Sequence, residues 1–317
     1  MGYGITIPFD GVPLSEHRSW IQEVEDLGYS DVWSAEADGT DAFTPLALSA
    51  AWTSKLKLGT AIVPVFTRGP ALVAQSAAAM AEAAPGRFVL GIGTSSDVIV
   101  ERWNSVPFEE PYKRTRDTVR FLRLALSGDK VDERFDTFRV RGFRLARPPA
   151  VIPPILVAAL RPGMLRLANR EADGAITNWL SAGDVKKVTS ELGEGKQLVA
   201  RVFVFPSEDS VTVRAIARRM IAAYLNVPVY AAFHEWLGRG DRLSPMWSAW
   251  KAGDRKAALE AIPDSVVDEL ILHGSTRSVR DQVQAYLDAG VTTVTLAVVS
   301  AGIDLRRAVR ELSPSAT

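Results

Sequence analysis

The chain has 317 residues, 47% of them hydrophobic and 23% charged, which is the composition of a soluble globular protein with a sizeable core. Its 37 Lys and Arg residues balance 37 Asp and Glu residues, and this zero net charge argues against a general nucleic-acid binder or a membrane-surface protein. The absence of cysteine excludes disulfides, thiolate metal ligands and thiol nucleophiles, and three widely separated histidines do not suggest a metal site.

Eight short apolar runs predict β-strands along the chain. They cover residues 2–8, 31–36, 57–65, 88–93, 154–159, 174–180, 198–206 and 292–299. Most of these runs are apolar throughout, as expected for parallel strands that are covered on both faces. The first run follows the N-terminus without the basic and apolar regions of a signal peptide, and no apolar run reaches the roughly 18–20 residues that span a bilayer. We therefore expect a cytoplasmic protein with no membrane partner.

Amphipathic segments between the apolar runs predict helices. Residues 15–28 begin with a Ser N-cap candidate and end in Gly, and residues 70–83 begin with Pro, which suits a first helical turn. The same pattern recurs over residues 112–127, 276–289 and about 304–312. The alternation of strands with helices predicts a single (β/α)8 TIM barrel domain over residues 1–317, rather than a doubly wound sheet.

Three segments exceed a simple strand–helix repeat. Residues 94–111 are polar and aromatic, and residues 226–262 are rich in aromatic residues and punctuated by Gly and Pro. In a barrel, insertions of this kind often form the mouth above the C-terminal ends of the strands. Residues 130–149 predict a surface hairpin before the fifth strand.

The third apolar run is interrupted. It reads LGTAIVPVFTRGP over residues 58–70, with Gly59 and Pro64 inside an otherwise apolar strand. Glycine weakens a strand, and proline cannot donate a hydrogen bond to its neighbour. From these residues alone the simpler interpretation is that Gly59 permits a bulge and Pro64 ends the strand.

Several segments, in order, resemble the luciferase-like family of flavin and deazaflavin oxidoreductases. They read LGTAIVPVFTRGPALVAQSAAAM, GRFVLGIGTSSDVIVERW and ILVAALRPGMLRLANREADGAITNWLS, and TRSVRDQVQAYLDAGVTTVTL fits the family's closing unit. Each motif is weak alone, but the ordered set is fairly specific and runs over nearly the whole chain. Within the family, VWSAEADGTDAFTPLALSAAWT and VERWNSVPFEEPYKRTRD are most similar to the coenzyme F420-dependent branch.

The resemblance implies a cofactor site at the ends of the barrel strands. It implies a non-prolyl cis peptide at Ala61-Ile62, in a bulge that backs the central ring of the cofactor. The implied cofactor contacts are Thr60, Ala61, Ile62, Gly93, Thr94, Ser95, Arg161, Gly163, Met164 and Trp179. The segment GIGTSS lacks the third Gly of a dinucleotide fingerprint, and a tight strand-to-loop turn is the alternative interpretation of it.

The segment RPGM opens a predicted helix after the fifth strand. Unpaired amides and a partial positive charge at a helix N-terminus bind phosphate, and Arg161 adds a cation. In the family the matching helix start holds the cofactor phosphate, which implicates the amides of Gly163 and Met164. The alternative is an ordinary barrel loop in which Gly163 serves the backbone conformation alone.

Glu36 is the candidate catalytic residue. The family pattern often places a His proton donor after this acid, where this chain has Ala37, and a Glu near the fourth strand, where it has Ser96. Both departures argue against sugar-phosphate dehydrogenase activity. A salt-bridged acid at the barrel rim is an equal alternative for Glu36. Tyr230 and His234 are then the candidate proton donors.

The resemblance implies an oxidoreductase that transfers a hydride between coenzyme F420 and a small-molecule substrate, with no metal. One alternative is an FMN-dependent monooxygenase or reductase on the same barrel, and another is a non-catalytic relative that binds a flavin-like molecule. Trp33, Trp103 and Trp179 are candidates for lining an apolar substrate pocket, with core packing favoured for Trp33. The family's habit predicts a homodimer. The substrate itself is not predicted by the sequence.

Overall fold

The computed structural model describes residues 1–316 and shows a closed parallel barrel. The barrel strands are β1 (Gly2–Thr6), β2 (Asp31–Ser34), β3 (Lys57–Thr60), β5 (Phe88–Gly93), β8 (Ile155–Ala158), β9 (Gly174–Asn178), β10 (Gln197–Phe205) and β12 (Thr293–Val298). Neighbouring strands pair in parallel, and the pairing of β9 with β10 closes the ring. Each of the apolar runs contains one of these strands, so the predicted (β/α)8 barrel is confirmed.

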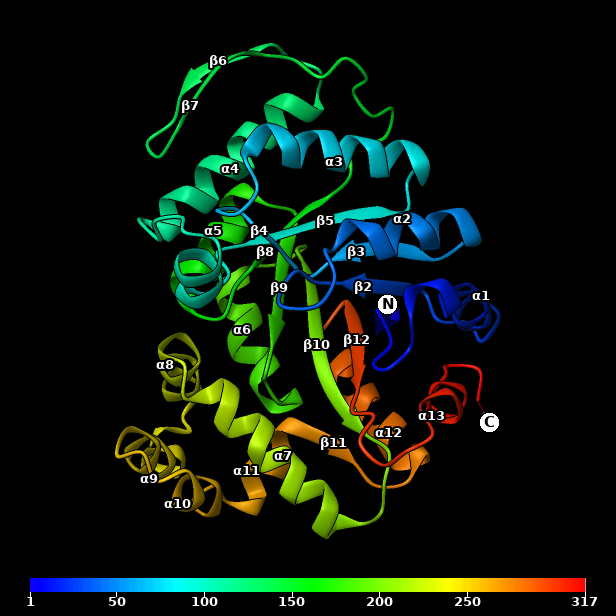
Figure 1. The fold of residues 1–317 in the computed structure, drawn as a ribbon, viewed down its shortest axis with the longest axis vertical. Helices are drawn as coiled ribbons and strands as arrows, with labels where there is room; N and C mark the ends of the chain where they lie inside the picture. The colour runs from blue at the N-terminus through cyan, green and yellow to red at the C-terminus, as the bar shows by residue number, and fades with distance from the viewer. Residues whose placement is uncertain (317) are drawn as a thin grey trace.

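Helices surround the barrel (Figure 1). They are α1 (His17–Asp26), α2 (Phe43–Trp52), α3 (Pro70–Ala83), α4 (Pro111–Leu126), α5 (Pro162–Glu171), α6 (Val185–Leu192), α7 (Ser210–Leu225), α12 (Thr276–Asp288) and α13 (Leu305–Glu311). The main hydrophobic core lies between these helices and the outer face of the strands. Within residues 1–316, none of the helices is both long and apolar enough to cross a membrane.

A second, smaller group of apolar side chains fills the inside of the barrel. It consists of Trp33, Val89, Leu156, Ile176 and Val199, one from each of five strands. Gly59 is required by this packing, because a Cβ atom there would lie 2.2 Å from the indole ring of Trp33. The glycine that interrupts the third apolar run therefore makes room for a large interior side chain, and Trp33 is a core residue, as expected.

The long insertion between β10 and β12 is helical. It contains α8 (Pro228–Leu237), α9 (Gly240–Lys251), α10 (Arg255–Glu260) and α11 (Asp264–Leu270), followed by the short strand β11 (Ile271–His273). These elements share a separate hydrophobic core with α7 and the end of β10. Strand β11 pairs with β10 at residues 203–205, beyond the last residue of β10 that pairs with β9. Figure 1 shows the insertion at one end of the molecule.

Arg239 anchors the insertion to the barrel. Its side chain is 4% exposed and pairs with Asp184, in the loop after β9, at 2.7 Å and with Glu269 of α11 at 2.8 Å. The same guanidinium donates a hydrogen bond of 3.0 Å to the hydroxyl of Ser181. One buried cation thus joins three separate segments, and it holds α8 against the C-terminal end of β9.

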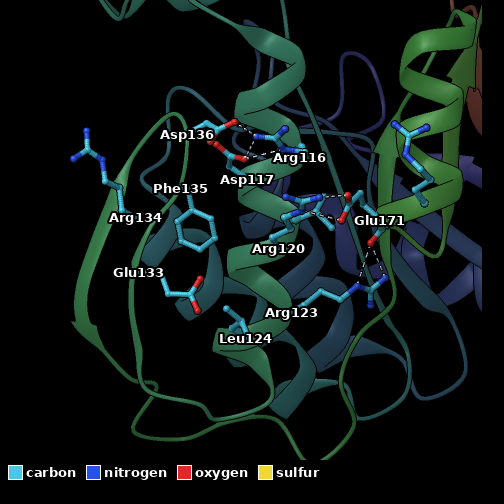
Figure 2. A pocket seen from close by; sticks show the side chains of 12 residues that line it. Arg116, Asp117, Arg120, Arg123, Leu124, Glu133, Arg134, Phe135, Asp136 and Glu171 are labelled. Atoms are coloured by element: carbon cyan, nitrogen blue, oxygen red, sulfur yellow. Dashed lines mark hydrogen bonds and ion pairs between the residues drawn. The ribbon is translucent and has the colours of Figure 1, made fainter.

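The predicted surface hairpin is confirmed as β6 (Val131–Arg134) paired antiparallel with β7 (Arg139–Phe143). A groove of about 620 Å³ lies between this hairpin, α4 and α5 (Figure 2). Its arginines are largely neutralised: Arg116 pairs with Asp117 and Asp136, and Arg120 pairs with Glu171. The groove lies on the outer flank of the barrel, away from the strand ends that carry the predicted site residues.

Candidate active site at the barrel mouth

The predicted site residues gather at the barrel mouth, which we define as the C-terminal ends of the barrel strands and the loops that follow them. Strand β3 ends at Thr60, and the chain pairs again with β5 as the short strand β4 (Val63–Pro64). The peptide bond between Ala61 and Ile62 is cis, which confirms that prediction. Both residues are half-buried and pack on the interior group of the barrel.

The absence of a side chain at Gly93 leaves room for Ile62. A Cβ atom on Gly93 would lie 2.7 Å from Cβ of Ala158 and 3.2 Å from the side chain of Ile62. Any larger residue at position 93 would therefore push Ile62 or Ala158 out of position. The result is an apolar shelf, formed by Ala61 and Ile62, which has the barrel interior below it and the mouth above it.

Hydrogen bonds hold the shelf from both neighbouring strands. The buried hydroxyl of Thr60 donates to the carbonyl of Gly91 at 2.8 Å and accepts from its N–H at 2.7 Å. On the other side, the amide of Ala61 donates to the carbonyl of Ser34, and the amide of Glu36 donates to the carbonyl of Ile62. The side chain of Thr60 is thus engaged with β5 and does not face the mouth.

Glu36 lies at the rim of the mouth in an ion pair. Its carboxylate, 14% exposed, receives hydrogen bonds from Nε of Arg68 at 2.9 and 3.0 Å, and Asp41 lies 3.6 Å from the same guanidinium. The guanidinium also lies over the ring of Phe43. Hydrogen bonding to Glu36 raises the pKa of Arg68 above its usual range. This geometry favours the salt-bridged alternative for Glu36, and Arg68 is a rim residue that the sequence analysis missed.

The loop after β5 passes beside the shelf. Thr94 and Ser95 are half-buried, and Ser95 adopts a left-handed backbone conformation with φ of 62°. The hydroxyl of Thr94 donates to the carbonyl of Ser95 at 3.2 Å, while Ser96 accepts a hydrogen bond from the amide of Ile99. Trp103, by contrast, is 55% exposed and does not line an enclosed pocket.

The start of α5 has the features expected of an anion site. Arg161 precedes the helix in an extended conformation and is exposed. Within residues 1–316, the amides of Gly163 and Met164 have no hydrogen-bond partner, as the first turn of a helix leaves them. Gly163 is exposed, and a Cβ atom on it would meet nothing within 4 Å.

Trp179 lies in the hydrophobic core that the insertion shares with α7, rather than at the surface of the mouth. It is 1% exposed and packs in a tilted arrangement against Phe203, with ring centroids 4.3 Å apart, and against Tyr224 at 5.1 Å. The residue before it, Asn178, remains half-buried at the end of β9 and exchanges hydrogen bonds of 3.2 Å with the hydroxyl of Tyr230. Tyr230 of α8 therefore reaches the mouth, and Asn178 is a further residue that the sequence analysis missed.

His234, the other donor candidate, is fully buried in α8. Burial, together with the charge of Arg239, lowers the pKa of His234 to about 3. A histidine that stays neutral at physiological pH and lies in the core is not a plausible proton donor.

This buried histidine predicts a loss of stability in mild acid. Below pH 6.5 the unfolded chain binds a proton on His234 that the native state does not bind until about pH 3. The free energy of unfolding should therefore fall by about 1.6 kcal/mol in total between pH 6.5 and pH 5 from this group alone. Urea unfolding of the wild type and of His234→Gln across that range measures the effect. An equally steep fall in the variant would contradict this assignment.

Comparison with known proteins places these features in a wider context. The family model described as luciferase-like monooxygenase matches residues 1–293. A 5,10-methylenetetrahydromethanopterin reductase of Methanolobus tindarius is 25% identical over 93% of both chains. An F420-dependent glucose-6-phosphate dehydrogenase of Nocardia farcinica is 28% identical over 96% of this chain and 89% of its own. The coenzyme F420-dependent tetrahydromethanopterin reductase of Methanopyrus kandleri shares the fold, with a TM-score of 0.81, 20% identity, and coverage of 99% of this chain and 98% of its own.

Proposed function

Because the chain belongs to the luciferase-like monooxygenase family, we propose that it is an oxidoreductase that moves a hydride between coenzyme F420 and a small organic substrate at the barrel mouth. The observation that carries this proposal is the Ala61–Ile62 shelf, which presents a half-buried apolar surface at the strand ends. The F420-dependent relative of Nocardia farcinica, which aligns over 96% of this chain, supports the choice of cofactor.

The residues of the mouth fit such a cofactor. The shelf suits the flat face of a deazaflavin ring, and Thr94 and Ser95 lie on the adjoining strand end, where they suit the ribityl chain. The two partnerless amides of α5, at Gly163 and Met164, suit its phosphate, with Arg161 as an added cation. We assign Thr60 and Trp179 to the support of this site, since their side chains are buried in protein contacts.

When bound, the deazaflavin supplies the hydride chemistry. The chain's own residues hold and orient the reactants. We assign Glu36 a positioning role, because its carboxylate is committed to Arg68 and its amide supports the shelf. Tyr230 is the better candidate to donate a proton: burial raises the pKa of its hydroxyl, although the hydrogen bond from Asn178 opposes that rise. It therefore stays protonated at neutral pH, where it can serve as a general acid.

An FMN-dependent monooxygenase is the second candidate function, because the family description names monooxygenases. The two activities differ in their use of oxygen. A third possibility, a carrier that binds the cofactor without turnover, is favoured by Ala37 at the position where relatives often have a His donor.

Turnover assays separate these three functions. Reduced coenzyme F420 is mixed with the protein and a panel of aldehydes, ketones and imines, both neutral compounds and ones that carry a carboxylate or a phosphate. The visible absorbance of the oxidised cofactor is followed. We expect substrate-dependent oxidation of coenzyme F420 and, with reduced FMN and oxygen, no oxygenated product of any compound in the panel. Enzyme-dependent formation of an oxygenated product with reduced FMN would favour the monooxygenase, and tight binding of coenzyme F420 without turnover on any compound would favour the carrier. The expected homodimer is tested by sedimentation velocity on the same preparation.

A further inference from the structure

A single arginine lies inside the barrel. Arg201 is the one charged residue of β10, and it comes two residues after Val199, which belongs to the interior group. Because side chains alternate along a strand, Arg201 faces the same way, one layer closer to the mouth. Its neighbours in register are Asn178 on β9 and Thr295 on β12. Its guanidinium lies over the ring of Phe203, 4.7 Å from the centroid.

This arginine has no partner among residues 1–316. It forms no hydrogen bond and no ion pair there, and its Nε atom is buried without an acceptor. The hydroxyl of Thr295, on the adjacent strand, is also buried without a partner. Two other arginines near the mouth, Arg68 and Arg239, differ in this respect, since both are paired with carboxylates. Arg201 is half-buried, and its guanidinium has no acceptor among residues 1–316, so it is available to bind an anionic ligand at the candidate site.

The groups around Arg201 leave its charge uncompensated. Asn178 and Tyr230 are bonded to each other and are neutral. Burial raises the pKa of Tyr230, and the nearby guanidinium of Arg201 partly lowers it again. A planar guanidinium carries several N–H donors in a fixed fork, which matches the geometry of a carboxylate or a phosphate.

We propose that Arg201 binds a compact oxyanion, a carboxylate or a phosphate monoester, on the substrate, with Asn178 and Tyr230 beside it. This inference rests on the proposed function in assigning the mouth to a substrate, and it extends that function by naming the substrate class. The enzyme acts on an organic acid or a phosphate ester rather than on a neutral alcohol or ketone. Tyr230, on this account, lies close to both the anchored anion and the reacting group.

The test uses calorimetric titration of the full chain, with and without bound coenzyme F420. The probes are benzoate, phenyl phosphate and the neutral amide benzamide. We expect the wild type to bind at least one of the two oxyanions and not benzamide, and their relative affinities identify which oxyanion is recognised. Arg201→Met, which keeps the stem over Phe203, should weaken that binding about 10-fold or more. Arg201→Lys, which keeps the charge, should retain a large part of it.

Controls separate this site from the cofactor and from a folding defect. Arg277→Met removes an exposed arginine of α12 and should leave oxyanion binding unchanged. Affinity for coenzyme F420 should change less than about twofold in Arg201→Met, because the cofactor phosphate is assigned to α5. The proposal is overturned if the wild type binds neither oxyanion, if folded Arg201→Met binds them as tightly, or if this variant loses coenzyme F420 binding instead. If the wild type binds the oxyanions through Arg201 but not coenzyme F420, the proposed function fails while this anion site stands.

Discussion

Arg239→Met is expected to lower the free energy of unfolding by about 3 kcal/mol. The arginine is 4% exposed and joins Asp184 to Glu269, so its removal leaves the 12%-exposed carboxylate of Asp184 without a cation. The insertion that carries Tyr230 would also lose its attachment to the loop after β9. Urea denaturation, followed by tryptophan fluorescence, measures the change.

Arg242 provides a matched control for this prediction. It binds the same Glu269, at 2.6 Å, but its own side chain is 39% exposed. Solvent screens such a pair, so Arg242→Met should cost less than about 1 kcal/mol. Equal losses of unfolding free energy in the two variants would show that the burial of Arg239 does not determine how much it stabilises the fold.

Gly163→Asp is expected to weaken coenzyme F420 binding about 10-fold or more. The new carboxylate would stand beside the two partnerless amides proposed to hold the phosphate, and like charges a few ångströms apart near a surface repel by a few kcal/mol at most. The fold should tolerate the change, because an acidic residue in the first turn of a helix is favourable and the position is open to solvent. Fluorescence titration with the cofactor measures the affinity.

Gly163→Ala is the control that separates the effect of charge from the effect of size. A Cβ atom there meets nothing within 4 Å, so the affinity for coenzyme F420 should stay close to that of the wild type. A second control is the deazaflavin fragment that lacks the phosphate. Its affinity should be nearly the same for the wild type and Gly163→Asp. If the Asp variant weakened the fragment and the whole cofactor by the same factor, the phosphate would lie elsewhere.

Much of the barrel follows from local rules in the sequence. Helix α3 begins at Pro70 and ends at Ala83, as predicted, because a proline suits the first turn of a helix. The insertion was harder to predict because its Gly and Pro residues suggest loops. In the structure several of them are helix boundaries: Pro228 begins α8, and Gly238 follows it in a left-handed conformation with φ of 96°. Pro245, by contrast, lies inside α9. A Gly or a Pro residue in the sequence indicates that an element begins or ends there, but it does not show whether that element is a helix, a strand or a loop.

The candidate site was only partly predictable, for a different reason. Motifs identified the shelf and the start of α5, since both are short, continuous segments. Glu36 and Arg68 are 32 residues apart, and no local pattern indicates that they pair. Arg201 had a visible signal, a lone charge in an apolar parallel strand, but its lack of a partner is a property of the packed barrel. The positions of Asn178 and Tyr230 also depend on how the insertion packs against β9.

The most direct test of the central claim is a parallel titration of the purified protein with coenzyme F420 and with FMN. The chain contains eight tryptophans, and Trp33 lies in the interior group directly beneath the shelf, so a ring bound there should quench tryptophan fluorescence. We predict saturable quenching by coenzyme F420, at a concentration at least about 10-fold lower than FMN requires, which corresponds to about 1.4 kcal/mol in binding free energy. Tighter binding of FMN, or no saturable binding of coenzyme F420, would contradict the proposed function.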